Sequence, residues 1–220
     1  MQNGENEMLE AYKTIFLEGR DEFVVSRSRF IGWAKPVATE EDALSFIETV
    51  RKSLWDATHH VWAYVSGASR ERYSDDGEPQ GTAGLPVLDV IRKEGLRDTA
   101  VVVARYFGGI KLGTGGLVRA YSHAAKIALE AGQIIEKRLF LSFDVGVLYA
   151  LTGKMQREFQ NRGYFIQNTA YTDQVTLTVL VPPSEKGPLY ALVADLTSGQ
   201  GSLNAGPEVY LSFRQGERIS

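Results

Sequence analysis

The sequence predicts a mixed α+β protein of two domains, and three observations lead to this prediction. The chain of 220 residues is longer than an average domain and can hold two compact units. Strand-like and helix-like segments alternate along it, and a polar break at Lys137-Arg138 separates two sets of them. Hydrophobic residues make up 44% and charged residues 23% of the chain, which suits two cores and argues against disorder. We therefore expect one domain over residues 1–136 and a second over residues 141–214.

The first domain is expected to begin with strands and a capped helix. Residues 23–25 and 30–34 are rich in β-formers, whereas the polar opening as far as about Glu18 shows no pattern and is expected to be loose. Thr39, followed by three acidic residues, is a helix-capping signal. Apolar residues then recur at helical spacing as far as Leu54, so a helix is expected to fill this stretch.

Further elements complete the first domain. A short β-prone run leads into a polar loop, and Thr82 is expected to cap a second helix that ends at Gly95. A valine-rich run then predicts a buried strand, and a glycine-rich turn predicts the start of a third helix. The expected ranges are 61–65 for the short strand, 68–81 for the loop, 99–104 for the buried strand and 108–116 for the turn, with Leu117, Tyr121, Ala124, Ala125 and Ala128 on one face of the third helix.

The second domain is expected to follow a strand-helix-strand-strand-helix-strand order. The segments are residues 142–148, 152–162, 164–171, 175–181, 184–196 and 209–213. This βαββαβ order is that of the split-βαβ, ferredoxin-like arrangement.

Composition excludes several classes of function. The chain contains no cysteine, which excludes disulfides and thiolate sites and favours a reducing, cytoplasmic location. It has no signal-peptide pattern and no apolar run long enough for a membrane span, so no membrane partner is expected. The net charge is −3, yet no acidic residue occurs between Asp98 and Glu130. The basic residues in that window include Arg105, Lys111, Arg119 and Lys126.

The segment Arg105–Arg119 is the strongest candidate for a binding site. Its glycines let the backbone approach a ligand closely, and the free N–H groups and dipole at a helix start favour an anion. It is not a P-loop, because Thr114 stands where lysine is required, and Val118 stands where a dinucleotide fingerprint needs its last glycine. A glycine turn that serves only close packing is the alternative. The candidate residues for binding an anion or nucleic acid are Arg105, Tyr106, Gly108, Gly109, Lys111, Gly113, Thr114, Gly115, Gly116 and Arg119.

A second segment, Ser74–Gly84, carries three carboxylates within four positions. Such oxygens could hold magnesium, although calcium-loop spacing is absent. They could instead be solvated or cap the helix after Gly81, or pair with Arg105 or Arg119 and so join the two glycine-rich segments. The residues of this acidic motif are Ser74, Asp75, Asp76, Gly77, Glu78 and Thr82. We expect no metal site, no cofactor and no catalytic residue here.

Three other groups of polar residues are given structural interpretations. His59 and His60 are neighbours on a strand and point to opposite faces, so at most one can serve a site. Ser122 and His123 are adjacent on a helix and do not face each other, which argues against a catalytic pair. The remaining group, Lys154, Arg157 and Arg162, is expected to form the solvated face of a helix in the second domain.

Both glycine-rich motifs, with Ser28–Ile31 before them, closely resemble the YigZ/IMPACT family of translation regulators. The resemblance covers residues 12–130, and the second domain resembles the extra domain of bacterial members. It implies a ribosomal protein S5 domain 2-like fold for the first domain and a fold like domain V of elongation factor G for the second. Eukaryotic members also carry an N-terminal RWD domain for partner binding, which we do not expect in the polar residues before about Glu18.

These observations lead us to expect a non-catalytic, translation-related regulator that binds RNA, the ribosome or a translation-associated protein through the basic glycine-rich face. The alternative is a metal-dependent enzyme acting on a phosphorylated or other anionic small molecule. A docking face for protein alone is a third interpretation.

Overall fold

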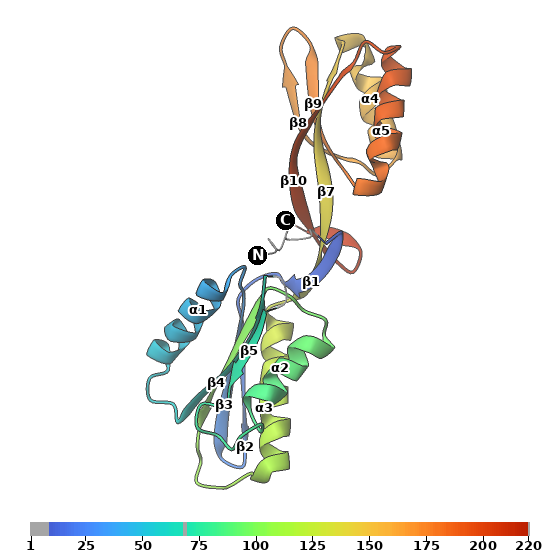
Figure 1. Cartoon of the computed structure of the whole chain (residues 1–220). Helices are drawn as coiled ribbons and strands as arrows, with labels where there is room; N and C mark the ends of the chain where they lie inside the picture. Colours follow the sequence, from blue (N-terminus) through green and yellow to red (C-terminus); the bar gives the residue numbers. More distant parts are fainter. Residues whose placement is uncertain (1–8, 68–69, 220) are drawn as a thin grey trace, which may run out of the picture.

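The computed structural model describes residues 9–67 and 70–219, which form two antiparallel sheets with separate cores (Figure 1). This confirms a mixed α+β protein of two domains. The first sheet has the order β2-β3-β6-β4-β5. Its strands are β2 (Gly19–Val25), β3 (Ser28–Pro36), β4 (His59–Ser66), β5 (Arg70–Ser74) and β6 (Thr99–Tyr106).

Helices cover both faces of this sheet. α1 (Glu40–Ser53) lies on one face, while α2 (Gly84–Lys93) and α3 (Gly113–Ala131) lie on the other (Figure 1). The central strand β6 is therefore buried on both sides, which explains why its sequence is a continuous apolar run. The capping signal at Thr39 is confirmed, because Thr39 and Asp42 form a reciprocal capping box at the start of α1.

The second sheet has the order β11-β10-β7-β9-β8, and β1 also pairs with β7. The strands are β1 (Ala11–Ile15), β7 (Ile134–Val147), β8 (Phe165–Tyr171), β9 (Val175–Val181), β10 (Ser202–Arg214) and β11 (Glu217–Ile219). The helices α4 (Tyr149–Asn161) and α5 (Lys186–Thr197), the latter preceded by a short 3-10 turn η1 (Pro183–Glu185), pack on one face of it (Figure 1). The predicted βαββαβ order from β7 to β10 is observed.

Two expectations about the connection between the domains were wrong. Lys137 and Arg138 do not interrupt the structure, because they lie inside the long strand β7. The partners of β7 there are β1 and β10, and the Arg138 guanidinium stacks 4.6 Å from the ring centroid of Phe213. Residues 11–15 are likewise not loose, since they form β1, and Ile15 is buried in the first core. Residues 1–8 lie outside the described residues.

Two expectations within the first domain also need correction. The polar loop contains strand β5, whose charged residues occupy the edge of the sheet, where side chains remain in water. Residues 68 and 69 lie outside the described part of the chain. Thr82 does not cap α2, because its hydroxyl donates to the carbonyl of Pro79 at 2.7 Å, and Ala83 occupies the cap position.

Close packing of α3 on β3 gives a test of the first core. A Cβ at Gly32 would lie 2.2 Å from the carbonyl oxygen of Ala124, so Gly32→Ala must push the helix off the sheet. We expect a loss of about 1–3 kcal/mol in the free energy of unfolding. Urea denaturation followed by tryptophan fluorescence reports this domain, because Trp33, Trp55 and Trp62 all lie in it.

The matched control is Gly153→Ala, because Gly153 is an exposed residue of α4 with open space around it. There alanine should stabilise the helix by about 0.5–1 kcal/mol, seen by circular dichroism, without moving the tryptophan transition. Equal stability of Gly32→Ala and the wild type would contradict the packing described here.

Candidate anion-binding site

The three carboxylates of the acidic motif have separate tasks, and the first of them caps a helix. The Asp75 carboxylate accepts hydrogen bonds from the backbone N–H groups of Gly81, Ala83 and Gly84, at 2.8, 3.1 and 2.8 Å. These N–H groups belong to the start of α2 and the turn before it. A carboxylate at this point also interacts favourably with the helix dipole. Asp75 therefore has the capping role that the sequence suggested for Thr82, and helix capping was also one of the alternatives for the acidic motif.

The second carboxylate, Asp76, ties the motif to β4. It accepts a hydrogen bond of 2.6 Å from the backbone N–H of His60 and lies 3.5 Å from the guanidinium of Arg51. The carbonyl oxygen of Asp76 lies 2.8 Å from Nδ1 of His59. A carbonyl can only accept, so Nδ1 of His59 carries the proton and, in the neutral ring, Nε2 is an acceptor.

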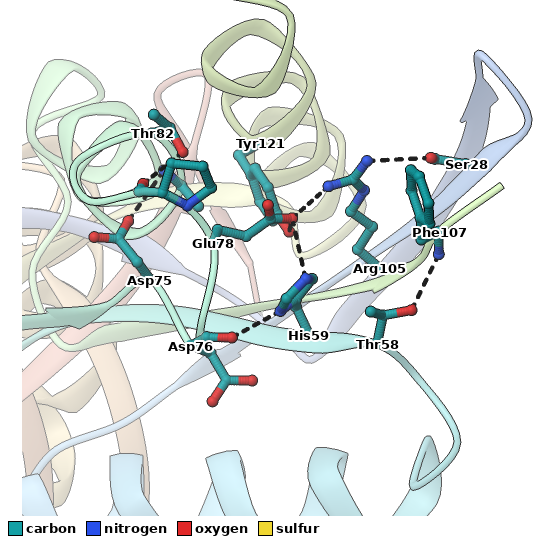
Figure 2. A network of polar contacts seen from close by, with 12 residues as sticks. Ser28, Thr58, His59, Asp75, Asp76, Glu78, Thr82, Arg105, Phe107 and Tyr121 are labelled. Carbon is teal, nitrogen blue, oxygen red and sulfur yellow. Dashed lines mark hydrogen bonds and ion pairs between the residues drawn. The ribbon is translucent and has the colours of Figure 1, made fainter. Parts of the chain in front are cut away.

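The third carboxylate, Glu78, is buried and joins the two glycine-rich segments. Its Oε1 accepts from Nη1 of Arg105 at 2.6 Å and from the hydroxyl of Tyr121 at 2.7 Å (Figure 2). Both members of the ion pair are less than one tenth exposed, at 8% for Glu78 and 5% for Arg105. Of the alternatives for the acidic motif, pairing with Arg105 is therefore observed.

Arg105 is buried and contacts several partners besides Glu78. Its guanidinium lies between the rings of Phe30 and Phe107, 5.4 and 5.3 Å from their centroids, and Nη2 donates to Oγ of Ser28 at 3.3 Å. Within the described residues, its Nε has no hydrogen-bond partner. Arg105 thus forms part of the wall of the site and is not a free surface cation.

Burial and the bond to Glu78 also set the protonation of Tyr121. Desolvation is the larger cause and the hydrogen bond to Glu78 the second, and together they raise the pKa of Tyr121 well above its usual range. The hydroxyl therefore stays a donor to Glu78 at all ordinary pH values.

The two histidines lie on opposite faces of β4, as predicted. His60 lies on the α1 side, where its Nε2 is 2.9 Å from the carbonyl oxygen of Leu54. His59 faces the other way, with Nε2 3.9 Å from Oε1 of Glu78 (Figure 2). His59 is opposite Arg105 in the pairing of β4 with β6, and that register brings it to the site.

His59, Glu78 and Arg105 line a cavity of about 420 Å³. It lies between the start of β4, the acidic motif and the start of α3. The lining residues are Thr58, His59, Glu78, Pro79, Arg105, Phe107, Lys111, Leu112, Gly113, Thr114 and Leu117. The volume is in the usual range of small-molecule sites, roughly 300–1,000 Å³.

The cavity gathers only part of the sequence-derived candidates. Arg105, Lys111, Gly113, Thr114 and Glu78 line it. Other candidates contact different groups or lie outside the lining. Tyr106 donates to Asp56, Gly108 packs against the backbone of Arg27, and Gly109, Gly115, Gly116 and Arg119 do not line the cavity.

Sequence reasoning missed several lining residues. Thr58 and Phe107 meet through a hydrogen bond of 3.1 Å from the backbone N–H of Phe107 to the Thr58 hydroxyl. The apolar residues Pro79, Leu112 and Leu117 also line the cavity, and this follows from the packing of the folded chain and not from any sequence motif. His59 could have been found by placing its strand next to the valine-rich strand that ends at Arg105.

The remaining polar candidates lie away from the cavity lining. His123 packs edge-on against the ring of Phe23, with centroids 4.7 Å apart. The basic residues Lys154 and Arg157 of α4, and Arg162 directly after it, are exposed, as predicted. Among residues 9–67 and 70–219, no three histidine, aspartate or glutamate side chains gather as a metal site, and no helix is long and apolar enough to span a membrane.

Comparisons with known proteins define the class of the chain. The Impact N-terminal domain matches residues 26–129, and a domain of unknown function, DUF1949, matches residues 145–200. The cavity thus lies within an Impact N-terminal domain.

Whole-chain relatives carry the same name. IMPACT family member YvyE of Bacillus subtilis (strain 168) is 37% identical over 206 residues, which is 93% of this chain and 95% of that protein. IMPACT family member YigZ of Escherichia coli (strain K12) is 37% identical over 82% of this chain and 91% of its own. A crystal structure of a hypothetical protein matches with a TM-score of 0.58 and 32% identity, over 91% of this chain and 99% of that one. The chain belongs to the IMPACT family, as the sequence motifs indicated.

A double-mutant cycle tests the buried ion pair. Arg105→Met leaves the Glu78 charge buried without a cation and should cost about 3 kcal/mol of unfolding free energy. Combining it with Glu78→Gln should cost at least about 1 kcal/mol less than the sum of the two single changes, because the double variant buries no unpaired charge. Urea denaturation measures all four proteins, and strict additivity would show that the two side chains do not interact.

The raised pKa of Tyr121 predicts an alkaline effect. A tyrosine in the unfolded chain ionises near pH 10, whereas the folded Tyr121 keeps its proton to higher pH. Its hydroxyl therefore contributes stability that is fully present below about pH 10 and is lost as the pH rises further. The stability gap between the wild type and Tyr121→Phe should narrow from about pH 9 to about pH 11. Tyr73→Phe, at an exposed tyrosine, is the control, and a gap that widens would contradict the assignment.

Proposed function

We propose that the chain is a non-catalytic, translation-related regulator that binds RNA phosphate groups, free or on the ribosome, through the face around the start of α3. Membership of the IMPACT family supports a role of this general kind. We also propose that the first domain has the ribosomal protein S5 domain 2-like fold. For the second domain we propose the ferredoxin-like fold, similar to domain V of elongation factor G, and its strand order β10-β7-β9-β8 supports this.

The observation that carries the proposal is a pair of uncompensated cations beside a helix start. Lys111 and Arg119 are exposed and form no ion pair with any described residue. Arg51, Arg92 and Lys126 in the same domain each contact a carboxylate. Lys52 and Lys93 also form no ion pair with a described residue, but they lie near the ends of α1 and α2 and not beside the start of α3. Exposed cations without acidic partners are free to neutralise phosphate.

The start of α3 adds to this positive potential. No side chain caps the helix, and its first turn contains no acidic residue. The N–H groups and dipole of a helix of 19 residues therefore face outward beside Lys111. Because these groups recognise phosphate and not base edges, we expect binding with little sequence preference.

The metal-dependent enzyme has weaker support. The three carboxylates that such an enzyme would use have separate structural roles. Asp75 caps a helix, Asp76 accepts a hydrogen bond from a strand, and Glu78 forms a buried ion pair. In the portion of the chain that the structure describes, they do not gather with other ligands around one point.

Charge reversal with a salt titration tests RNA binding. Lys111→Glu combined with Arg119→Glu should weaken binding of a long single-stranded RNA by more than about tenfold at low salt. It should also reduce the slope of log affinity against log salt by about 1.4, or about 0.7 for each phosphate that is no longer neutralised. Fluorescence anisotropy at several salt concentrations measures both quantities.

The control is Lys52→Glu combined with Lys93→Glu, which changes net charge equally at exposed lysines on α1 and α2. This control should bind RNA almost as the wild type does. Binding that is independent of salt, or equally weakened by both double variants, would rule out a specific phosphate-binding face.

A further inference from the structure

We propose that the 420 Å³ cavity binds a single ribonucleoside monophosphate unit, with its phosphate at the start of α3 and its ribose hydroxyls at Glu78 and His59. Two molecules present this chemistry, a free ribonucleotide and the 3′-terminal nucleotide of an RNA. The second source rests on the proposed function, because the exposed cations would then hold the rest of the strand.

The cavity has the size and depth for one nucleotide. Its volume is in the range of small-molecule sites, and its wall contains Glu78 and Arg105, both buried. A ligand reaches these groups by entering the cavity. An end of a strand, or a free nucleotide, can do so because at most one neighbouring nucleotide has to remain outside.

The phosphate has one favourable position in the cavity. The Glu78 carboxylate repels an anion. The charge of Arg105 is already paired with Glu78 through the 2.6 Å contact, so it is not available to an anion. The groups that remain to attract a phosphate are the Lys111 ammonium, the uncapped N–H groups of Gly113 and Thr114, and the hydroxyl of Thr114 as a neutral donor, and these residues line the cavity from one segment. A phosphate is therefore stabilised at this segment and away from Glu78.

Glu78 and His59, by contrast, need hydrogen-bond donors from a ligand. Oε1 of Glu78 is occupied by Arg105 and Tyr121, but Oε2 accepts no hydrogen bond from any residue within the described ranges. In the neutral ring, Nε2 of His59 is an acceptor, and it lies 3.9 Å from Oε1 of Glu78. Two neighbouring acceptors in a partly closed site are satisfied by a ligand with two neighbouring hydroxyls, such as the 2′,3′-diol of ribose.

Part of the cavity wall is apolar. Phe107 is 46% exposed although it lines the cavity, and Leu112, Leu117 and Pro79 extend this surface. An exposed aromatic ring beside a phosphate site is the usual platform for a nucleobase, with little preference among bases. Phosphate, diol and base each then meet a matching part of one cavity.

The end chemistry of an RNA tests this inference without altering the protein. The probes are four forms of one short oligoadenylate. Three are linear and end in a 3′-hydroxyl, a 3′-phosphate or a 2′,3′-dideoxy nucleotide, and the fourth is circular. The first should bind at least about tenfold more tightly than each of the others, because they leave Glu78 and His59 without donors or bring a second anion to Glu78. Adenosine 5′-monophosphate should compete with the first, whereas its 2′,3′-dideoxy analogue should compete poorly.

A protein-side test uses Glu78→Gln, which keeps the size of the side chain but loses its charge. This variant should lose most of the preference for the 3′-hydroxyl end while keeping the salt slope. Glu185→Gln is the matched control, because Glu185 also accepts from a tyrosine, Tyr164, but lies in the second domain. Melting temperatures check that both variants fold, and His59→Ala replaces Glu78→Gln if that variant does not.

The outcomes separate this inference from the proposed function. Equal, salt-dependent binding of all four RNAs would overturn the inference and leave the RNA-binding face intact. Binding of the free monophosphate with no binding of any RNA would support the cavity as a nucleotide site and overturn the RNA-binding proposal. Failure of every probe to bind would overturn both.

Discussion

The first domain depends on one buried ion pair, Glu78 with Arg105. Removing two opposite charges from water is costly, and this cost is offset only when both are hydrogen-bonded in good geometry. Tyr121 and Ser28 supply the additional bonds, from α3 and β3, so that four elements far apart in the sequence meet at one carboxylate and one guanidinium. The ion pair joins the two glycine-rich segments, which the pairing of β5 and β6 with β4 also brings close together.

Around this pair, local geometry decides which groups remain available. Asp75 and Asp76 are used to fix the acidic motif to α2 and to β4, and fixing the motif aims Glu78 inward. Gly108 allows the β2-β3 turn to approach, since a Cβ there would lie 2.0 Å from the carbonyl oxygen of Arg27. Lys111 and the N–H groups at the start of α3 form no such structural contacts, so the positive charge available to a ligand lies in this one segment of the cavity wall.

Much of this could be predicted from the sequence. The capping signal at Thr39, the valine run of β6 and the opposite faces of His59 and His60 follow from local chemistry and strand periodicity, and the structure has all three. Capping of the helix after Gly81 by the acidic motif was one of the alternatives, but spacing could not single out Asp75, because its three N–H partners lie six to nine positions away along an irregular loop. The interpretation of Lys137 and Arg138 as a polar break failed for a related reason, since both lie inside the long strand β7 and the ring of Phe213 packs against Arg138. In both cases the structure depends on contacts between residues far apart in the sequence, and a single sequence does not reveal such contacts.

The long strand β7 connects the two domains without a flexible linker (Figure 1). Its 14 residues span roughly 45 Å at about 3.3 Å per residue, with β10 beside most of its length and β1 beside its first part. Bending it would break ladder hydrogen bonds to both neighbours. The strand therefore fixes the distance between the two domains. A partner that contacts the cavity face and the second domain together must present two surfaces at that distance. Geometry alone would then select among partners of identical chemistry, and shortening β7 by a pair of residues would change which partner fits.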